Sequence, residues 1–297
     1  MSLSVVYTRA ALGVKAPLIS VEVHLSNGLP GLTLVGLPET TVKEARDRVR
    51  SAIINSGYTF PAKKITINLA PADLPKEGGR YDLPIAIALL AASEQLNASR
   101  LGSYEFVGEL ALTGALRGVP GAISGALEAI RAGRQIIMAN ENAAEVSLIA
   151  EKGCLVAGHL QEVCAYLEKP HELAEPEECH DTLPAPADDL SDILGQEQGK
   201  RALEITAAGG HNLLLIGPPG TGKTMLASRL SGLLPPLNNH EALESAAILS
   251  LVNATSLHKQ WRRRPFRSPH HSASLTAMVG GGAIPGPGEI SLAHNGI

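Results

Sequence analysis

Hydrophobic and polar positions follow two different periods along the first part of the chain. In residues 18–25, LISVEVHL, apolar side chains alternate with polar ones, which is the pattern of a half-buried strand. Residues 42–53 instead carry apolar side chains at helical spacing, and Gly57 ends that helix. Residues 83–92 are almost wholly apolar, which predicts a central helix buried on all sides. The two periods together favour a mixed α/β fold.

The remaining patterns extend this prediction over residues 1–168. Thr41 and Glu44 form a capping box at the start of the helix that Gly57 ends. Further strands are predicted at residues 32–35, 64–69, 104–112, 135–139 and 154–157. Further helices are predicted at residues 122–132, 142–150 and 160–167. Strands and helices in mixed order predict a two-layer α/β domain, and they argue against an all-β fold or a helical bundle.

An acidic linker, residues 169–190, separates this domain from a second one over residues 191–297. From Glu172 to Asp192 the chain has many acidic residues, several prolines, and no Lys or Arg. Such a stretch repels itself and buries little apolar surface, so we expect it to be extended or disordered. The helix predicted over residues 42–53 has the opposite charge on its outer face. Its cations form either a solvated face or a surface for acidic partners: Lys43, Arg46, Arg48 and Arg50.

Composition limits the classes of function. The 297 residues, 44% of them hydrophobic, are enough for two domains with buried cores. A net charge of −4 and 3% aromatic residues exclude a globally basic or aromatic nucleic-acid surface, so such a site must be local. Three cysteines without a CxxC pattern favour reduced thiols. No signal peptide and no long apolar run is found, so we expect a cytoplasmic protein with no membrane partner.

The second domain contains a phosphate-loop motif. Residues 212–216 form a short apolar run that predicts a buried strand, and residues 225–233 favour a helix. Between them, the pattern G-x-x-x-x-G-K-[ST] is met by Gly217, Pro218, Pro219, Gly220, Thr221, Gly222, Lys223 and Thr224. In such loops backbone N–H groups cradle the phosphates, Lys223 would reach the β- and γ-phosphates, and Thr224 would bind Mg²⁺. The motif predicts a nucleoside triphosphate site, with ATP and Mg²⁺ as the expected cofactors.

Residues 258–271, HKQWRRRPFRSPHH, form a local basic segment. Two aromatic residues, Trp261 and Phe266, are interleaved with its cations, and the segment contains no acid. The cations are Lys259, Arg262, Arg263, Arg264 and Arg267. They are candidates to contact a DNA backbone despite the negative charge of the whole chain. Ion pairing with the acidic linker or with a neighbouring subunit is the alternative, and the spacing does not decide between them.

Two stretches of the first domain resemble the proteolytic domain of Lon-type proteases, whose fold is related to a ribosomal S5 domain. They are residues 75–78, PKEG, which lead into an apolar helix, and residues 116–133, LRGVPGAISGALEAIRAG. In those proteases the first motif continues into the nucleophilic Ser, and the second carries the Lys that acts as its base. Arg80 and Ile123 stand at these positions here, and Ser124 has no Lys beside it. We therefore expect a Lon-like α/β domain without protease activity.

The second domain resembles AAA+ ATPases. Residues 193–196 are similar to an I-x-G-Q element that packs against adenine in that class, so the resemblance makes Ile193 and Gln196 candidate base contacts. Residues 264–272, 279–282 and 287–296 resemble the magnesium-chelatase-like AAA+ proteins. Joined to an inactive Lon-like domain, they form the layout of the YifB/ComM competence protein family.

The resemblance implies a hexameric ATPase that moves along DNA and promotes branch migration during recombination and natural transformation. A magnesium-chelatase-like subunit that remodels a protein partner is the alternative. In the family, residues 294–296 lead into a strand that ends in the Walker B Asp-Glu, whereas this chain ends at Ile297. We therefore expect an incomplete P-loop AAA+ α/β domain, without Walker B, sensors or lid, that binds ATP with little or no turnover.

Overall fold

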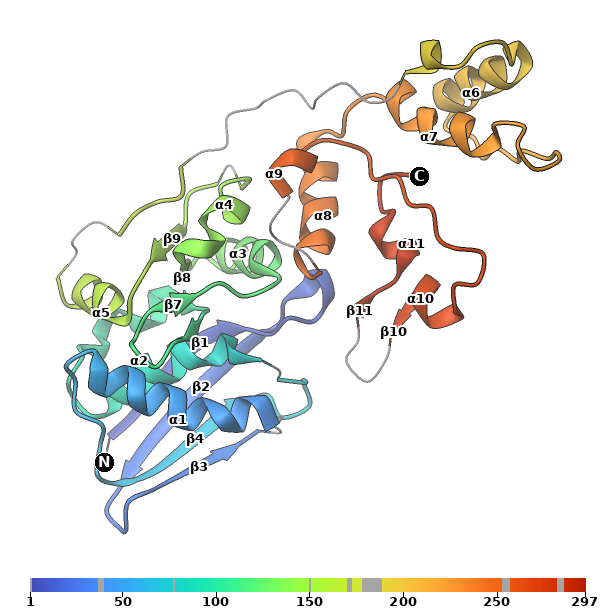
Figure 1. The fold of residues 1–297 in the computed structure, drawn as a ribbon. Helices are drawn as coiled ribbons and strands as arrows, with labels where there is room; N and C mark the ends of the chain where they lie inside the picture. Colours follow the sequence, from blue (N-terminus) through green and yellow to red (C-terminus); the bar gives the residue numbers. More distant parts are fainter. Residues whose placement is uncertain are drawn as a thin grey trace. The chain divides into compact units, whose positions relative to one another are not determined.

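The computed structural model divides the chain into two compact units, and each is described by itself (Figure 1). The first unit comprises residues 1–179 and 250–255, and the second comprises residues 180–249 and 256–297. The structure describes residues 2–36, 40–76, 78–149, 151–169, 173–177, 189–252, 257–281 and 286–297, without the side chains of residues 40–43 and 258–259. The Thr41 capping side chain, Glu77 and most of the acidic linker therefore lie outside the described residues.

A seven-stranded sheet forms the centre of the first unit, in the order β3-β4-β2-β1-β5-β8-β9. Its strands are β1 (Ser2–Arg9), β2 (Leu18–Ser26), β3 (Gly31–Val35), β4 (Lys64–Ala70), β5 (Tyr104–Phe106), β8 (Gln135–Ala139) and β9 (Cys154–Ala157). The β1–β2 and β2–β4 pairs are antiparallel, and the other pairs are parallel. The strands predicted at residues 18–25, 32–35, 64–69, 135–139 and 154–157 are confirmed, and the mixed α/β fold class with them.

The strands of the first unit differ from the prediction in two places. The first strand, β1, was not predicted, and the single strand predicted over residues 104–112 is wrong. That stretch divides into β5 and β6 (Glu109–Leu110), and β6 pairs with β7 (Leu116–Arg117) in a separate ribbon. The break falls at Gly108, whose N–H donates to the carbonyl of Arg80 and whose carbonyl accepts from Leu83. The backbone of Gly108 is bonded to residues at the start of the central helix α2, so the chain turns away from the sheet at this point.

The helices of the first unit follow the predicted positions closely. They are α1 (Thr40–Asn55), α2 (Asp82–Ala92), α3 (Ala122–Arg131), α4 (Ala143–Val146) and α5 (Leu160–Glu168), with short 3₁₀ turns η1 (Gly13–Lys15), η2 (Gly79–Tyr81), η3 (Ala98–Ser103) and η4 (Asn140–Asn142). Every residue of α2 is buried, as its apolar pattern predicts. The helix predicted over residues 142–150 is shorter in the structure, because only α4 and the η4 turn before it form there.

Helices cover both faces of the sheet at its β5–β8–β9 end, so the predicted two-layer arrangement is wrong there. Helices α1, α2 and α5 share one core with Ile137 of β8. Helix α3 instead places Gly125 against Ile136, the neighbouring residue on β8. Successive strand residues point to opposite faces, so α3 lies on the face opposite α2. Burial on both sides also explains why β8 and β9 are continuous apolar runs.

A buried ion pair lies under α3. The carboxylate of Glu105, on β5, is fully buried and accepts from Arg9 Nε at 2.6 Å and from Arg9 Nη2 at 2.8 Å. Arg134 Nη1 donates to the same carboxylate at 3.3 Å. Arg9 also donates to the carbonyl of Glu128 on α3, at 3.0 Å. The pair therefore ties β1 and β5 to the helix that covers them.

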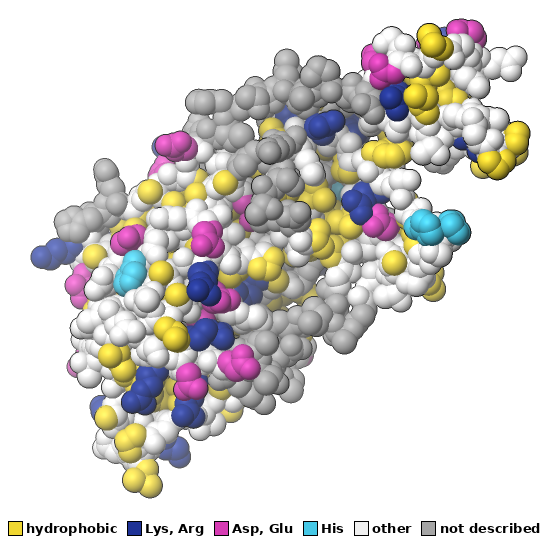
Figure 2. All heavy atoms as spheres, in the orientation of Figure 1, with side chains coloured by type: hydrophobic (Ala, Val, Ile, Leu, Met, Phe, Trp, Pro, Cys, Tyr) yellow, Lys and Arg dark blue, Asp and Glu magenta, His cyan; other side chains and the backbone are white. Residues whose placement is uncertain are grey.

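The basic face of α1 is largely involved in contacts within the first unit. Arg48 donates two hydrogen bonds to the buried carboxylate of Asp82, and the Arg50 guanidinium lies over the ring of Phe60. Arg46 pairs with its neighbour Asp47 at 3.5 Å. Figure 2 shows Lys and Arg side chains of this unit lying among Asp and Glu side chains, without a large field of one sign. Arg46, Arg48 and Arg50 therefore have partners within the unit, and the Lys43 side chain lies outside the described residues.

The second unit is built from helices and turns around a small core. Its elements are η5 (Leu190–Asp192), α6 (Glu197–Gly209), α7 (Lys223–Leu233), α8 (Asn239–Ser250), α9 (Leu257–Gln260), α10 (Leu275–Val279), β10 (Gly280–Gly281), β11 (Gly286–Pro287) and α11 (Glu289–Leu292). Ile193, Leu203 and Leu226 pack together between α6 and α7. The helix predicted over residues 225–233 is confirmed as most of α7.

The buried strand predicted over residues 212–216 is wrong. These residues form no strand, and Leu214 and Ile216 are 80% and 87% exposed. A strand requires a neighbour that accepts and donates its backbone hydrogen bonds, and none of the described residues pairs with this segment. The apolar pattern is present without the sheet that would bury it. In the described part of the chain, no helix is both long and apolar enough to span a membrane.

Candidate nucleotide site and basic segment

The phosphate loop runs into the first turn of α7. Gly222 precedes the helix, and both Gly220 and Gly222 adopt φ of +79°, a conformation that side chains with a Cβ rarely tolerate. Lys223 is the first residue of α7, so the loop ends where the N–H groups of a helix have no carbonyl partner within that helix. This arrangement presents several donors and the positive end of the helix dipole to an anion.

The Lys223 ammonium lies over the loop. Its Nζ donates to the carbonyl oxygens of Gly217 at 2.8 Å and Pro218 at 2.6 Å, and it lies 3.3 Å from Thr221 Oγ1. None of these partners carries a formal charge. A phosphate would therefore offer the ammonium a stronger, charged acceptor than the neutral oxygens it now contacts. The side chain of Thr224, the predicted Mg²⁺ ligand, is exposed next to the loop.

The two candidate base contacts have different environments. Ile193 is buried in the core with Leu203 and Leu226, so its side chain serves packing. Gln196 is exposed, and its Nε2 donates to the carbonyl of Thr221 in the phosphate loop at 3.3 Å. Between them, Leu194 is 95% exposed. The sequence did not indicate that Gln196 bonds to the loop, because the two residues are far apart in the chain.

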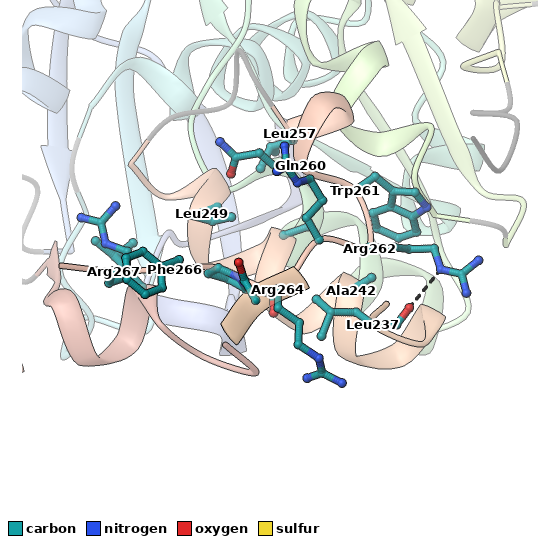
Figure 3. Close-up of a pocket in the computed structure, with 16 residues that line it drawn as sticks. Leu237, Ala242, Leu249, Leu257, Gln260, Trp261, Arg262, Arg264, Phe266 and Arg267 are labelled. Atoms are coloured by element: carbon teal, nitrogen blue, oxygen red, sulfur yellow. Dashed lines mark hydrogen bonds between the residues drawn. The ribbon is translucent and has the colours of Figure 1, made fainter. Parts of the chain in front are cut away.

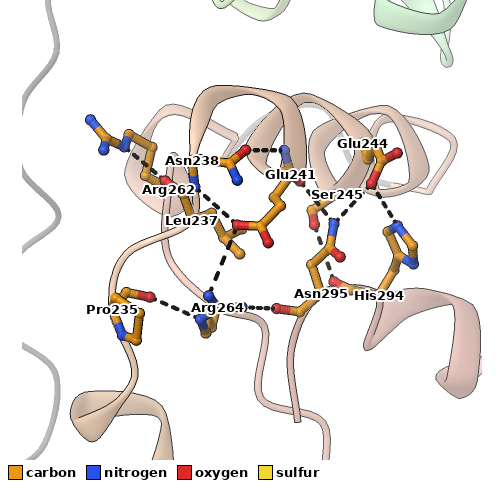
Figure 4. A network of polar contacts seen from close by, with 10 residues as sticks. All are labelled: Pro235, Leu237, Asn238, Glu241, Glu244, Ser245, Arg262, Arg264, His294 and Asn295. Atoms are coloured by element: carbon orange, nitrogen blue, oxygen red, sulfur yellow. Dashed lines mark hydrogen bonds and ion pairs between the residues drawn. The ribbon is translucent and has the colours of Figure 1, made fainter. Parts of the chain in front are cut away.

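The basic segment is mostly held inside the second unit. Arg264 Nε donates to the carbonyl of Pro235 at 2.8 Å, and its Nη1 donates to the carbonyl of Asn295 at 2.9 Å (Figure 4). Its Nη2 lies 3.9 Å from the Glu241 carboxylate, and the side chain is only 17% exposed. Arg262 Nε donates to the carbonyl of Leu237 at 2.9 Å. These contacts join three separate parts of the unit.

The remaining cations of the segment are Arg263, Arg267 and Lys259, and they differ in whether a partner is described for them. Arg267 forms a bidentate pair with Glu289 on α11, with both N···O distances at 2.6 Å. Arg263 is exposed, and its guanidinium has no hydrogen bond or ion pair within the described residues. The Lys259 side chain lies outside the described residues. Of the predicted DNA contacts that the structure describes, Arg263 is therefore the one whose charge faces solvent without a partner.

A second layer of polar contacts stabilises the same region (Figure 4). Glu244 accepts from His294 Nε2 and from Asn295 Nδ2, both at 3.1 Å. Ser245 Oγ donates to the carbonyl of His294 at 3.1 Å. These bonds connect α8 to the residues just before the end of the chain. They draw that segment toward the side of α8 on which Arg264 also lies.

Both aromatic residues of the segment, Trp261 and Phe266, line a cavity. Figure 3 shows a hollow between α8 and residues 260–267, with a volume of about 270 Å³. Its walls are partly apolar, and Trp261 is buried beside it. Arg262 and Arg264 line the same hollow while donating to backbone carbonyls. Residues 260–267 therefore form part of the framework of the unit as well as a basic surface.

The two positions that the resemblance assigns to the Lon-type dyad, Arg80 and Ile123, are both buried in the first unit. Arg80 is 4% exposed, and burial lowers the pKa of its guanidinium, opposed by the charge of Glu145. The Glu145 carboxylate also accepts the N–H of Ile123, at 3.3 Å. Ser124 is buried, and its hydroxyl has no hydrogen-bond partner within the described residues. An arginine and an isoleucine at these positions supply neither a nucleophile nor its base.

Within the residues that the structure describes, no group of three or more His, Cys, Asp or Glu side chains could hold a metal ion. The adjacent His270 and His271 lie side by side, with ring centroids 4.1 Å apart, and His270 contacts the Ser272 hydroxyl.

Comparison with known proteins covers both units. The family model described as subunit ChlI of Mg-chelatase matches residues 21–142, and the model described as magnesium chelatase, subunit ChlI, matches residues 189–297. The protein YifB of Salmonella typhimurium is 80% identical, and YifB of Escherichia coli is 79% identical, each over the whole of this chain. Competence protein ComM of Haemophilus influenzae is 57% identical, also over the whole chain. The chain spans 59% of the length of each of these relatives. From these matches, the chain belongs to the magnesium-chelatase-like ChlI family, together with YifB and ComM.

Proposed function

We propose that the chain binds ATP with Mg²⁺ at the loop Gly217–Thr224. The observation that carries this proposal is the geometry of the loop: two glycines with φ of +79° lead into the start of α7, and the Lys223 ammonium is held over them. A neutral structural turn would need neither the lysine nor the exposed helix start. The loop's backbone donors and Lys223 would hold the phosphates, and Thr224 would hold the Mg²⁺. When bound, Mg²⁺ supplies charge neutralisation between the phosphates.

Nucleotide titration with a Lys223→Ala variant tests this proposal. Loss of one charge-assisted bond to phosphate is worth about 1.5–3 kcal/mol, so we expect affinity for ATP to fall by roughly ten- to a hundredfold. Lys200→Ala is the matched control, because Lys200 lies on α6 and pairs with Glu197. Equal binding of ATP by the parent chain and by Lys223→Ala would refute the proposed site. Thr224→Ala should weaken binding only when Mg²⁺ is present.

We further propose that the complete protein is an AAA+ motor that acts on DNA, as a homo-hexamer, in recombination or competence. Support comes from the similarity to competence protein ComM and from the match of both units to magnesium chelatase subunit ChlI models. The chain covers 59% of these relatives, so turnover, DNA movement and assembly belong to the complete protein in this proposal. Phosphate release by this chain alone should be slight, which a coupled ATPase assay measures.

DNA binding across a salt series tests the motor proposal. Arg263 is the described cation of the basic segment without an internal partner, so Arg263→Ala should weaken binding and reduce the salt slope by about 0.9. Arg201→Ala is the control, since Arg201 is an exposed arginine of the same unit that pairs with Glu204. A change of equal size in both variants would contradict a contact at Arg263. No DNA binding by the complete protein would refute the motor proposal.

One observation favours a second candidate, an ATPase subunit that remodels a protein partner. Arg264 and Arg267 use their guanidinium groups within the unit, which leaves fewer charges for a DNA backbone than the sequence suggests. The family model for residues 189–297 is that of a magnesium chelatase subunit. This candidate predicts binding of ATP with no dependence of turnover on DNA. Stimulation of the complete protein's ATPase by DNA would exclude it.

A further inference from the structure

We propose that Gln196 is a positioning residue of the phosphate loop: its side chain orients the Thr221–Gly222 peptide so that the Gly222 N–H faces a bound phosphate. This inference rests on the proposed nucleotide site. It assigns Gln196 a different role from the base contact that the resemblance to AAA+ ATPases implies. In this role Gln196 supports binding of the triphosphate and makes no contact with the base.

The hydrogen bond between Gln196 and the loop is the first observation. Gln196 precedes α6 with φ of 58° and ψ of 38°, a left-handed conformation that is uncommon for a residue with a side chain. From there its Nε2 donates to the Thr221 carbonyl at 3.3 Å. The Thr221 hydroxyl is held separately, because it donates to the Pro218 carbonyl at 2.9 Å. Thr221 is thus fixed at both its backbone and its side chain.

The geometry of the peptide bond converts this contact into an effect on the phosphate site. In a trans peptide the C=O and the following N–H point in opposite directions. Because the Thr221 carbonyl points toward Gln196, the Gly222 N–H points away from Gln196. Gly222 immediately precedes α7, where the free N–H groups of the helix start bind anions. The bond from Gln196 therefore selects the peptide orientation that adds one more donor to that site.

Within the described part of the chain, Gln196 is the residue that donates to the Thr221 carbonyl. Gly220 and Gly222 have no side chains, and a Cβ built on either would meet no atom within 4 Å. Glycine populates positive and negative φ about equally, so a peptide next to such residues can rotate at little cost. In the opposite orientation the Thr221 carbonyl would face the phosphate and repel it. A fixed donor on one side of the loop prevents that rotation.

Gln196 can act as that donor because the chain before it is anchored. Ile193 is buried between α6 and α7, and Asp192 lies 3.4 Å from Arg229 Nη2 on α7. Gly199, on the first turn of α6, lies against Leu226 of α7, where a Cβ would come within 2.9 Å of the leucine side chain. Helices α6 and α7 are therefore in close contact. Gln196 lies between the anchored residues Asp192 and Ile193 and the start of α6, so it has little freedom to move away from the loop.

The test compares three ligands in Gln196→Ala and in the matched control Gln198→Ala, an exposed glutamine two residues further on. The ligands are ATP, GTP and inorganic tripolyphosphate, each titrated with Mg²⁺. Loss of one neutral hydrogen bond is worth about 0.5–1.5 kcal/mol, so we expect all three affinities to fall by about three- to tenfold. Gln198→Ala should leave them unchanged. Gln196→Met, which keeps the length of the side chain without the donor, should behave like Gln196→Ala.

Other outcomes would overturn the inference. A loss confined to ATP, with tripolyphosphate binding unchanged, would show that Gln196 contacts the base. Unchanged binding of all three ligands would show that the bond to Thr221 has no effect. Hydrogen exchange with saturating tripolyphosphate and Mg²⁺ provides the second readout: the Gly222 N–H should exchange faster in Gln196→Ala than in the parent chain, while exchange in the Leu203–Leu226 core and the melting temperature stay the same. Failure of the parent chain to bind any of the ligands would instead refute the nucleotide site itself.

Discussion

Replacement of Arg264 by Met should destabilise the second unit by about 2–4 kcal/mol. The guanidinium donates to two backbone carbonyls, of Pro235 and Asn295, and is 17% exposed. Hydrogen bonds from charged groups contribute about 1.5–3 kcal/mol each, and partial exposure lowers the sum. The contact with Glu241, at 3.9 Å and partly exposed, adds less than about 1 kcal/mol. Methionine retains the apolar stem, so the change isolates the polar contacts.

Urea denaturation followed by tryptophan fluorescence measures this effect directly. Trp261 is the single tryptophan of the chain and is buried in the second unit, so its emission reports on that unit. Arg263→Met is the control, since Arg263 is next to Arg264 in the chain and its side chain is exposed. If Arg264→Met shifts the midpoint no more than Arg263→Met does, the framework role of Arg264 is wrong. The pair of variants also separates stability from DNA affinity, because Arg263→Met should change only the latter.

Further predictions concern the first unit. Burial raises the pKa of Asp82 to about 6 from 3.8, although Arg48 donates to it, so the folded state binds that proton more tightly than the unfolded state. Protonated Asp82 therefore stabilises the folded state by up to about 3 kcal/mol below about pH 4. This stabilisation falls as the pH rises and is lost above about pH 6. In urea melts, Asp82→Asn should make the free energy of unfolding less dependent on pH between about pH 4 and 6. Glu105→Gln should cost about 3–5 kcal/mol, because Arg9 stays buried beside a neutral amide, and a loss below about 1 kcal/mol would contradict the buried pair. Labelled casein should remain uncleaved by the chain and by Ser124→Ala alike. Cleavage by the chain would contradict the loss of protease activity, and cleavage that persists in Ser124→Ala would show that the nucleophile is another residue.

Local patterns predicted much of the first unit because its apolar residues either alternate clearly with polar ones or form one long run. The apolar run at residues 83–92 has few alternatives to a central helix, and alternation at residues 18–25 fits one face of a sheet. The third layer formed by α3 could not be predicted, since it depends on which face of β8 the helix covers. Strand β1 was missed because its alternation is weak: Leu3 and Val5 are both apolar and exposed.

Local spacing predicts the phosphate loop, whereas the contacts around the loop and the basic segment depend on residues that are distant in the sequence. The spacing of Gly217, Gly222 and Lys223 is a local property, and the structure places Gly222 and Lys223 at the start of α7. The partners of Arg264 and Arg267 are far away in the sequence, at Asn295 and Glu289, and no local pattern predicts such pairs. A count of positive charges therefore overestimates the surface available to DNA.

The unpaired residues 212–216 have a consequence for handling the protein. Leu214 and Ile216 expose apolar side chains beside backbone groups that pair with no described strand. Such a segment is a template for β-pairing between molecules, and its low charge offers no electrostatic barrier to it. Preparations of these 297 residues should therefore scatter more light as their concentration rises. Refolding yields should improve on dilution, and a charged residue at position 214 should improve them further.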